Sequence, residues 1–369
     1  MLEEIFLSLL IISLFGMTAL QFFIWKGLAS LQSPQNEKLH QFSVIIAARN
    51  EEEHIGSCLH SLVTQNYPKE LFEIIVANDR STDRTAEIIS EFCAEFSNVR
   101  TITITGLRPG YFPKKNALTS AIEIARNEIL AFTDADCIAS PNWLKTLSSY
   151  YAEEVGVVTG RCINDTSKIS SLFGKLFYTY ENLKVSLSTA AAIGMQSAYT
   201  GKGGNFSYRK IVYNEVGGFS AINRSVSGDD DLFIQLIQQK TDWKIQYMKE
   251  EGSETVTNPP LKLKNFIKQR RRHISASKYY ALKFKIVFGI SHAFTFLSLL
   301  GLFIIPLYAL IAILIRINID AVILFRYPEF IRAKLKWTDI FIGELLLLFY
   351  TVCIGPIGFT KSISWKEAS

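Results

Sequence analysis

Cysteine is scarce in this 369-residue chain, and charged residues are missing from two long stretches of it. The five cysteines are scattered, with no pair separated by two residues, so they form neither a zinc-ligand pattern nor a disulfide framework. Four of them lie in the polar middle of the chain, where we expect buried thiols in a reducing cytosol. The same middle region lacks internal repeats and low-complexity tracts, which excludes a repeat architecture.

The first charge-free stretch runs from Ile5 to Trp25 and has the length of a membrane span, about 20 residues. A cleaved signal peptide is the alternative, but Glu3 and Glu4 stand where such a peptide needs basic residues. We therefore predict a permanent transmembrane anchor at residues 1–26. Lys26 follows the apolar run, which predicts that the middle region is cytoplasmic and that the N-terminus lies outside.

The second charge-free stretch, residues 286–315, lacks Asp, Glu, Lys and Arg. As one helix it would be about 45 Å long, which exceeds the roughly 30 Å of the hydrocarbon layer. It is therefore either one tilted helix or two short spans that fold back around Gly301 and Pro306. Residues 316–336 hold five cations against two acids, so a cytoplasmic location of that segment favours the hairpin.

The rest of the C-terminal region divides into a basic segment and a last span. Residues 261–285 carry nine lysines and arginines and no acid, which is typical of an interfacial segment on anionic lipid. Nucleic-acid binding is rejected, because the segment adjoins the membrane and no nucleic-acid motif accompanies it. A last span is predicted at about residues 340–360, with Glu344 against a partner helix or at the interface. Residues 286–360 thus form a membrane region of two or three spans, followed by a tail at 361–369.

Residues 40–260 are predicted to form an α/β domain, because short β-branched runs alternate with segments of helical periodicity. The predicted strands cover residues 42–48, 73–77, 99–104 and 128–132, and the predicted helices cover residues 51–63, 85–96 and 114–127. Such alternation implies a mostly parallel sheet with helices on both faces. Ligands of such sheets bind beyond the carboxyl ends of the strands.

Polar clusters follow three of the predicted strands. Their members are Arg49, Asn50 and Glu51 after the first strand, Asn78 and Asp79 after the second, and Asp134 and Asp136 after the fourth. A single Asp or Asn at such a place is usually a turn or cap residue, but three clusters at one edge of a sheet are harder to explain in this way. The carboxylates of Asp134 and Asp136 suit Mg²⁺ or Mn²⁺, which would bridge them to substrate phosphates.

Three further segments are candidates for substrate contact. Lys114 opens a helix whose N-terminus suits phosphate, although a solvated charge is the plainer explanation. Gly203, Gly204 and Asn205 lie in a glycine-rich loop without P-loop spacing, which we interpret as a flexible loop on the acceptor side. Three carboxylates at 229–231 begin a helix, where they either complement the helix dipole or supply a general base for an acceptor hydroxyl.

Together these clusters resemble the family 2 glycosyltransferases with a GT-A (Rossmann-like) fold, which include the membrane synthases of cellulose, hyaluronan and poly-N-acetylglucosamine and ceramide glucosyltransferase. The resemblance covers about residues 42–273 and rests on the ordered set of motifs. It implies a hexosyltransferase in the cell membrane, with a cytoplasmic catalytic domain. Such an enzyme moves a sugar with inversion from a nucleotide-sugar, here expected to be a UDP-sugar, to a hydroxyl of a lipid or glycan acceptor, and it depends on Mg²⁺ or Mn²⁺.

The resemblance also implies roles for individual residues. Donor binding falls to Arg49, Asn50, Glu51, Asp79, Lys114, Asp134 and Gln269. Asp136 takes the metal-binding position together with Asp134, and Asp229 that of the catalytic base, with Asp230 as the second choice. Arg272 matches the arginine of a Q-x-x-R-W motif that faces the donor diphosphate.

Four positions depart from the pattern of the family. Asn78 replaces the first aspartate of a D-D-G-S-T-D motif, and Ala47 replaces a proline. Gly228 replaces the glutamate before the base, and His273 replaces the tryptophan that would contact an acceptor sugar. The last two departures make a single transfer as plausible as processive synthesis.

Two rival functions use the same residues. A nucleotidyl- or phospho-transferase on a similar sheet would release pyrophosphate or a nucleotide-linked product. A non-catalytic membrane scaffold with a degenerate transferase domain would show no metal-dependent nucleotide binding.

Overall fold

The computed structural model describes residues 1–34, 36–330 and 335–354, which form two compact units. A helical unit combines residues 1–31, 166–195 and the described residues from Pro260 onward. A sheet unit combines the described residues of 32–165 and 196–259. The segment 166–195 therefore belongs with the apolar helices, although it lies inside the range 40–260 that the sequence assigns to one domain.

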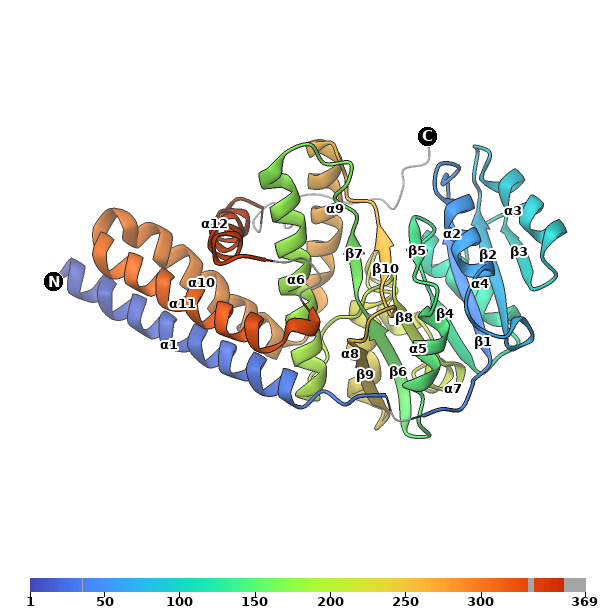
Figure 1. Ribbon diagram of the computed structural model, residues 1–369, viewed down its shortest axis with the longest axis horizontal. Coiled ribbons are helices and arrows are strands. Elements are labelled where there is room, and N and C mark those ends of the chain that lie inside the picture. Colours follow the sequence, from blue (N-terminus) through green and yellow to red (C-terminus); the bar gives the residue numbers. More distant parts are fainter. Residues whose placement is uncertain (35, 331–334, 355–369) are drawn as a thin grey trace. The chain divides into compact units, whose positions relative to one another are not determined.

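A seven-stranded sheet organises the sheet unit, in the order β3-β2-β1-β4-β8-β6-β9 (Figure 1). Its strands are β1 (Phe42–Ala48), β2 (Phe72–Asp79), β3 (Val99–Ile104), β4 (Ile129–Phe132), β6 (Val155–Gly160), β8 (Phe206–Arg209) and β9 (Lys244–Met248). β8 runs antiparallel to β4 and β6, and the other pairings are parallel. The predicted α/β fold with a mostly parallel sheet is confirmed.

A small second sheet and six helices complete this unit. The small sheet has the order β5-β10-β7, with strands β5 (Cys137–Ala139), β7 (Cys162–Asn164) and β10 (Thr255–Thr257). The helices are α2 (Ile55–Val63), α3 (Thr85–Glu95), α4 (Pro113–Ile124), α5 (Trp143–Ser149), α7 (Lys210–Glu215) and α8 (Asp231–Lys240). Three of these helices, α2, α3 and α4, follow their strands at or near the predicted positions.

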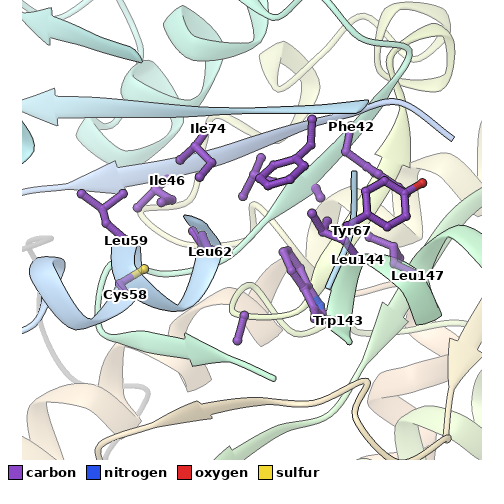
Figure 2. Packing of buried hydrophobic residues seen from close by; sticks show 14 of the residues in the cluster. Phe42, Ile46, Cys58, Leu59, Leu62, Tyr67, Ile74, Trp143, Leu144 and Leu147 are labelled. Atoms are coloured by element: carbon purple, nitrogen blue, oxygen red, sulfur yellow. The ribbon is translucent and has the colours of Figure 1, made fainter. Parts of the chain in front are cut away.

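Apolar side chains bury both faces of the central strands, as expected for a parallel sheet covered by helices. Phe42 and Ile46 of β1 pack with Leu59 of α2 and Trp143 of α5 on one face (Figure 2). Ile45 alternates to the opposite face and is also fully buried. Truncation of Leu59 to alanine would remove about 3 kcal/mol of stability, because the packed interior cannot fill the resulting cavity.

The helical unit consists of long apolar helices and two others. Its members are α1 (Leu2–Ala29), α6 (Leu172–Gly194), α9 (Leu263–Ala276), α10 (Leu282–Ile304), α11 (Pro306–Arg326) and α12 (Trp337–Ile354). α1, α10, α11 and α12 are long and apolar enough to cross a membrane. α1, α10 and α11 pack side by side (Figure 1), while Phe15, Phe303 and Leu307 stay exposed, as on a lipid-facing surface.

The hairpin predicted in the C-terminal region is present, but its spans are longer than expected. The chain breaks at Ile305, and Pro306 opens α11 because proline suits the first position of a helix. Gly301 is not part of the break: it lies within α10, where an added Cβ would approach the Cβ of Ala309 to 2.9 Å. The second span does not end at residue 315, since α11 continues to Arg326.

Charged residues inside α11 and α12 neutralise one another. Lys184 of α6 places its Nζ 2.7 Å from Asp320 Oδ2 and 3.0 Å from Glu344 Oε1. Arg316 Nη2 lies 3.2 Å from Glu344 Oε2, and the Tyr180 hydroxyl donates to Glu344 Oε1 at 2.8 Å. Arg316 and Asp320 are buried within α11, so the second helix of the hairpin extends into the segment 316–336 that was considered as a cytoplasmic connection.

Of the two positions considered for Glu344, the structure shows the one against a partner helix. The last span begins at Trp337 and is described to Ile354. Its predicted end at residue 360 and the tail at 361–369 lie outside the described residues.

Candidate active site

Three strand ends meet at one edge of the large sheet. β1 lies between β2 and β4 and is parallel to both, with Ala48 paired to Asn78 and Ile45 paired to Phe132. The residues that follow these strands therefore emerge on the same edge, where ligands of such sheets bind.

The loops after β1 and β2 are tied together by hydrogen bonds. Asn50 donates its backbone N–H to the Ser81 hydroxyl at 3.1 Å, and its side-chain oxygen accepts from the Thr82 backbone N–H at 2.8 Å. The backbone N–H of Glu51 donates to the Thr85 hydroxyl at 2.8 Å. These bonds fix the two loops relative to each other and hold the predicted donor-binding residues Asn50 and Glu51 in place.

Asp79 is fully buried at the end of β2. Its carboxylate accepts a hydrogen bond from Arg80 Nε at 2.8 Å and lies 3.8 Å from Nη1 of Arg49. The structure thus brings two predicted donor-binding residues, Arg49 and Asp79, into contact. Arg80 was not predicted, although it stands at the glycine position of the D-D-G-S-T-D motif and its φ is +52°, in the left-handed region that favours glycine.

Lys114, near the start of α4, joins carboxylates from two distant parts of the chain. Its Nζ lies 2.9 Å from Asp134 Oδ1 and 2.8 Å from Asp229 Oδ2. Burial alone would lower the pKa of Lys114, but these two carboxylates together raise it above its ordinary value. The lysine is therefore charged at neutral pH and can donate to phosphate.

The space behind Lys114 is small. A cavity of about 10 Å³, room for about one water molecule, lies between Lys114, Asp229 and the side chains of Phe132 and Tyr208. The Asp134 side chain, in contrast, is 39% exposed. Asp134 is therefore the more exposed of the two carboxylates that Lys114 joins.

Asp134 and Asp136 stand in the turn between β4 and β5. Their carboxylate oxygens and the Sγ of Cys137 all lie within 4.8 Å of one another. Carboxylate oxygens are the ligands that hard cations such as Mg²⁺ and Mn²⁺ prefer, so this pair fits the metal that the sequence predicts.

The segment before α8 carries Asp229 and Asp230. Burial alone would raise the pKa of Asp229, but Lys114, with a smaller contribution from Lys115, holds it below its ordinary value. Burial and the neighbouring Asp229 carboxylate raise the pKa of Asp230. Asp230 also accepts hydrogen bonds from the backbone N–H groups of Asp231 at 2.7 Å and Gly203 at 2.9 Å.

Gly228 explains one departure from the family pattern. Its φ is +104°, in the left-handed region that favours glycine, and an added Cβ would lie 2.6 Å from Leu232 Cδ1. A glutamate at this position would strain the backbone and collide with α8. The turn therefore places Asp229 beside Lys114 in a conformation that needs glycine.

Lys115 binds the segment that precedes Gly228 and Asp229, and it was not predicted from the sequence as a site residue. Its fully buried ammonium donates to three backbone carbonyls, those of Ile222 at 3.0 Å, Ser225 at 2.6 Å and Ser227 at 2.9 Å. Burial lowers the pKa of Lys115 to about 8. The sequence shows only two adjacent lysines and does not indicate that one faces the site while the other faces the interior.

The glycine-rich loop is divided between the cluster and the interior. An added Cβ at Gly203 would lie 3.5 Å from Lys114 Nζ and 3.6 Å from Asp134 Oδ2, so this glycine adjoins the charged cluster. Asn205 is buried: its amide oxygen accepts from Trp143 Nε1 at 2.9 Å, and its amide nitrogen donates to two backbone carbonyls. The Gly204 carbonyl accepts from two threonine hydroxyls, which anchor the loop.

Two predicted residues, Gln269 and Arg272, lie on α9 in the helical unit. Their roles stay predictions. Their neighbour Arg270 forms a bidentate pair with Glu181, at 2.9 and 3.1 Å, and stacks on Phe266. Of the three consecutive arginines, Arg270 therefore ties α9 to α6.

The strand order, the carboxylate pair and the lysine-bridged cluster agree with the family suggested by the motifs. The chain belongs to the glycosyl transferase family 2, whose model matches residues 43–229. A curated relative, the probable glycosyltransferase YdaM of Bacillus subtilis, is 26% identical over 259 residues, which are 67% of this chain and 58% of that protein. The chain thus spans little more than half the length of this relative.

A relative from Methanococcus voltae matches almost end to end. It is a dolichyl N-acetyl-alpha-D-glucosaminyl phosphate 3-beta-D-2,3-diacetamido-2,3-dideoxy-beta-D-glucuronosyltransferase, 26% identical over 339 residues, which are 87% of this chain and 96% of that protein. Among solved structures, the mannosyltransferase PcManGT of Pyrobaculum calidifontis, in complex with GDP-Man and Mn²⁺, has a TM-score of 0.55. It is 17% identical and covers 94% of this chain and 98% of its own, a likeness that shows the GT-A fold.

Proposed function

We propose that this chain transfers a sugar, with inversion, from a nucleotide-sugar donor to a hydroxyl group of a lipid or glycan acceptor, on the cytoplasmic side of a membrane. The observation that carries the proposal is the Lys114 bridge, which joins a carboxylate of the Asp134–Asp136 pair to Asp229. Family membership and the apolar helices support it.

The residues of the cluster supply a general base and groups that stabilise the charge of the leaving diphosphate. Asp229 accepts the proton of the acceptor hydroxyl, because its carboxylate is ionised at neutral pH. Lys114 donates to the diphosphate that leaves the sugar. Asp134 and Asp136 would hold Mg²⁺ or Mn²⁺, and the ion when bound neutralises charge on the diphosphate. Asp79 and Arg49 line the nucleotide side, and Gln269 and Arg272 are assigned to the donor diphosphate.

Binding of the donor also changes the basicity of the Asp229 carboxylate. When the diphosphate competes for Lys114, Asp229 loses part of its closest positive partner. The pKa of Asp229 then rises, and the carboxylate becomes a stronger base at the stage at which the acceptor needs one.

The test is a panel of UDP-, GDP- and other nucleotide-sugars with the purified, detergent-solubilised protein and Mn²⁺. We expect release of a nucleoside diphosphate from one donor, dependent on the metal and lost in Asp136→Asn. Release of pyrophosphate or of a nucleotide-linked product would favour a nucleotidyl- or phospho-transferase. An absence of metal-dependent nucleotide binding would favour the scaffold.

A further inference from the structure

Two thiols lie side by side next to the carboxylate pair of the candidate active site. Cys137 opens β5 and Cys162 opens β7, on the two strands that flank β10 in the small sheet. Their Sγ atoms are 3.8 Å apart, and the Sγ of Cys137 is also 3.8 Å from Asp136 Oδ1. Gly204 adjoins both thiols, since an added Cβ there would lie 2.8 and 3.0 Å from the two sulfur atoms.

These separations match the edges of a tetrahedral metal site. With metal–sulfur bonds of about 2.3 Å, two thiolates on a tetrahedral Zn²⁺ are about 3.8 Å apart, and a thiolate and a carboxylate oxygen are about 3.5 Å apart. A disulfide instead requires a sulfur–sulfur distance of about 2.05 Å. The separation between the thiols is therefore compatible with a shared metal ion.

The donor set differs from that of the metal proposed for catalysis. Two thiolates favour Zn²⁺ and related soft ions, whereas Mg²⁺ and Mn²⁺ favour carboxylate, carbonyl and water oxygens. Asp134 and Asp136 bring anionic oxygens within 4.8 Å of the Cys137 sulfur, and Cys162 adjoins this group through its 3.8 Å contact with Cys137. The cysteines are 25 residues apart in the chain and show no zinc-ligand spacing, so the site exists only through the fold.

We propose that Cys137, Cys162 and Asp136 bind a soft divalent cation such as Zn²⁺. Because Asp136 cannot serve two ions in full, the soft ion competes with Mn²⁺ and inhibits transfer. The inhibition rests on the proposed function, whereas binding of the ion does not.

Cadmium is the probe, because thiolate-to-Cd²⁺ charge transfer gives an ultraviolet band that carboxylates do not give. The experiment uses the full chain in detergent with a phosphine reductant, in a Cys353→Ser background that removes the exposed thiol. We expect one Cd²⁺ per chain with the band. Cys162→Ser should lose most of the band and bind Cd²⁺ at least about tenfold more weakly. Asp136→Asn should weaken binding but keep the band.

Cys93→Ser is the matched control, since Cys93 is a partly buried thiol of α3 outside this group, and it should leave the titration unchanged. Thermal unfolding without metal shows whether the serine variants are folded, and Cys162→Ala repeats the test without a hydroxyl. A band that persists in folded Cys162→Ser and Cys162→Ala, or no band in the parent, overturns the site. If the band requires both thiols but no donor is used, the site stands and the proposed transfer fails.

Discussion

Two lysines of this chain each lie between two carboxylates, and the two clusters differ in charge balance and in exposure. Lys114 lies within 2.9 Å of Asp134 and Asp229 in the sheet unit. Lys184 lies within 3.0 Å of Asp320 and Glu344 in the helical unit. Arg316 adds a second cation to the Lys184 cluster, whereas Asp230 adds a further carboxylate beside the Lys114 cluster.

The charge balance distinguishes the Lys184 cluster, which stabilises the fold, from the Lys114 cluster, which is the candidate active site. Around Lys184 two cations face two anions, and three of these four residues, Arg316, Asp320 and Glu344, are buried, so the cluster carries no net charge. Around Lys114 the anions outnumber the cations, and Asp134 is 39% exposed. An excess of accessible negative charge attracts a metal ion, whereas a balanced and largely buried cluster holds helices together.

The largest effect is expected for Asp229→Asn, which removes the proposed base. Transfer should fall about 100- to 10,000-fold, the range of general base catalysis, while the protein stays folded. The measurement is the rate of nucleoside diphosphate release at saturating donor and Mn²⁺. Asp242→Asn, an exposed position in the same unit, is the matched control and should keep the full rate. Normal transfer by Asp229→Asn would remove the base from this residue.

The corresponding change in the helical unit, Glu344→Gln, should affect stability and leave chemistry intact. It leaves Arg316 and Lys184 with one carboxylate between them, at a cost of about 3–5 kcal/mol. Thermal unfolding in detergent measures the loss. The remaining folded protein should transfer at the normal rate per molecule.

A double variant sharpens this second prediction. Arg316→Gln combined with Glu344→Gln restores equal charge, with Lys184 still facing Asp320. Its stability loss should be smaller than the sum of the two single losses. If the two losses are additive, Arg316 and Glu344 do not stabilise each other. The contrast between the Lys184 cluster and the Lys114 cluster is then not supported.

A smaller loss is expected for Lys115→Met, which leaves three backbone carbonyls before Gly228 without their donor. The free energy of unfolding should fall by about 2–3 kcal/mol. Transfer should fall as well, because the segment that positions Asp229 is loosened. The exposed Lys145 offers the matched control, and Lys145→Met should change neither stability nor rate. An unchanged rate in folded Lys115→Met would show that the segment is positioned without it.

Local patterns in the sequence predicted those strands and helices whose apolar residues follow a clear pattern. The run at Phe42–Ala48 coincides with β1, because a buried parallel strand is continuously apolar, and the strand predicted at 99–104 coincides with β3, which alternates between buried and more exposed residues at the edge of the sheet. The antiparallel β8 was not predicted, since its four residues carry no signal for direction. The sequence did not predict that α6 belongs to the helical unit. Its side chains are buried by partners that lie far along the chain, and no local pattern shows this.

The candidate active site was likewise predicted from the sequence only in part. The clusters after β1, β2 and β4 could be placed on one edge, since parallel strands end together. That Lys114 bridges Asp134 to Asp229, and that Lys115 faces the interior instead, depends on the rotation of α4, which adjacent lysines do not reveal. The pairing of Arg316 and Glu344 was hidden for a different reason, because each charge alone suggests a boundary of a membrane span.

The smallest expected effect concerns pH and distinguishes Asp229 from Asp230 as the base. The pKa of Asp229 lies below its ordinary value, since Lys114 outweighs its burial, and that of Asp230 lies above it through burial and the Asp229 charge. A base must be deprotonated to act, so the rate falls as the pH drops through its pKa. If Asp229 is the base, the acid limb of kcat/KM for the donor, which reports the free enzyme, lies below about pH 4.

The acid limb of kcat should lie at higher pH than that of kcat/KM, because in the donor complex the diphosphate competes for Lys114 and the pKa of Asp229 rises. Rates of diphosphate release between about pH 4 and 8, with Mn²⁺ saturating, measure the kcat limb and show whether a kcat/KM limb lies above about pH 4. Lys114→Gln should bring the two limbs together, since neither state then has the ammonium. A kcat/KM limb clearly above about pH 4 that disappears in Asp230→Asn would instead assign the proton to Asp230 and leave Asp229 as the partner that holds Lys114.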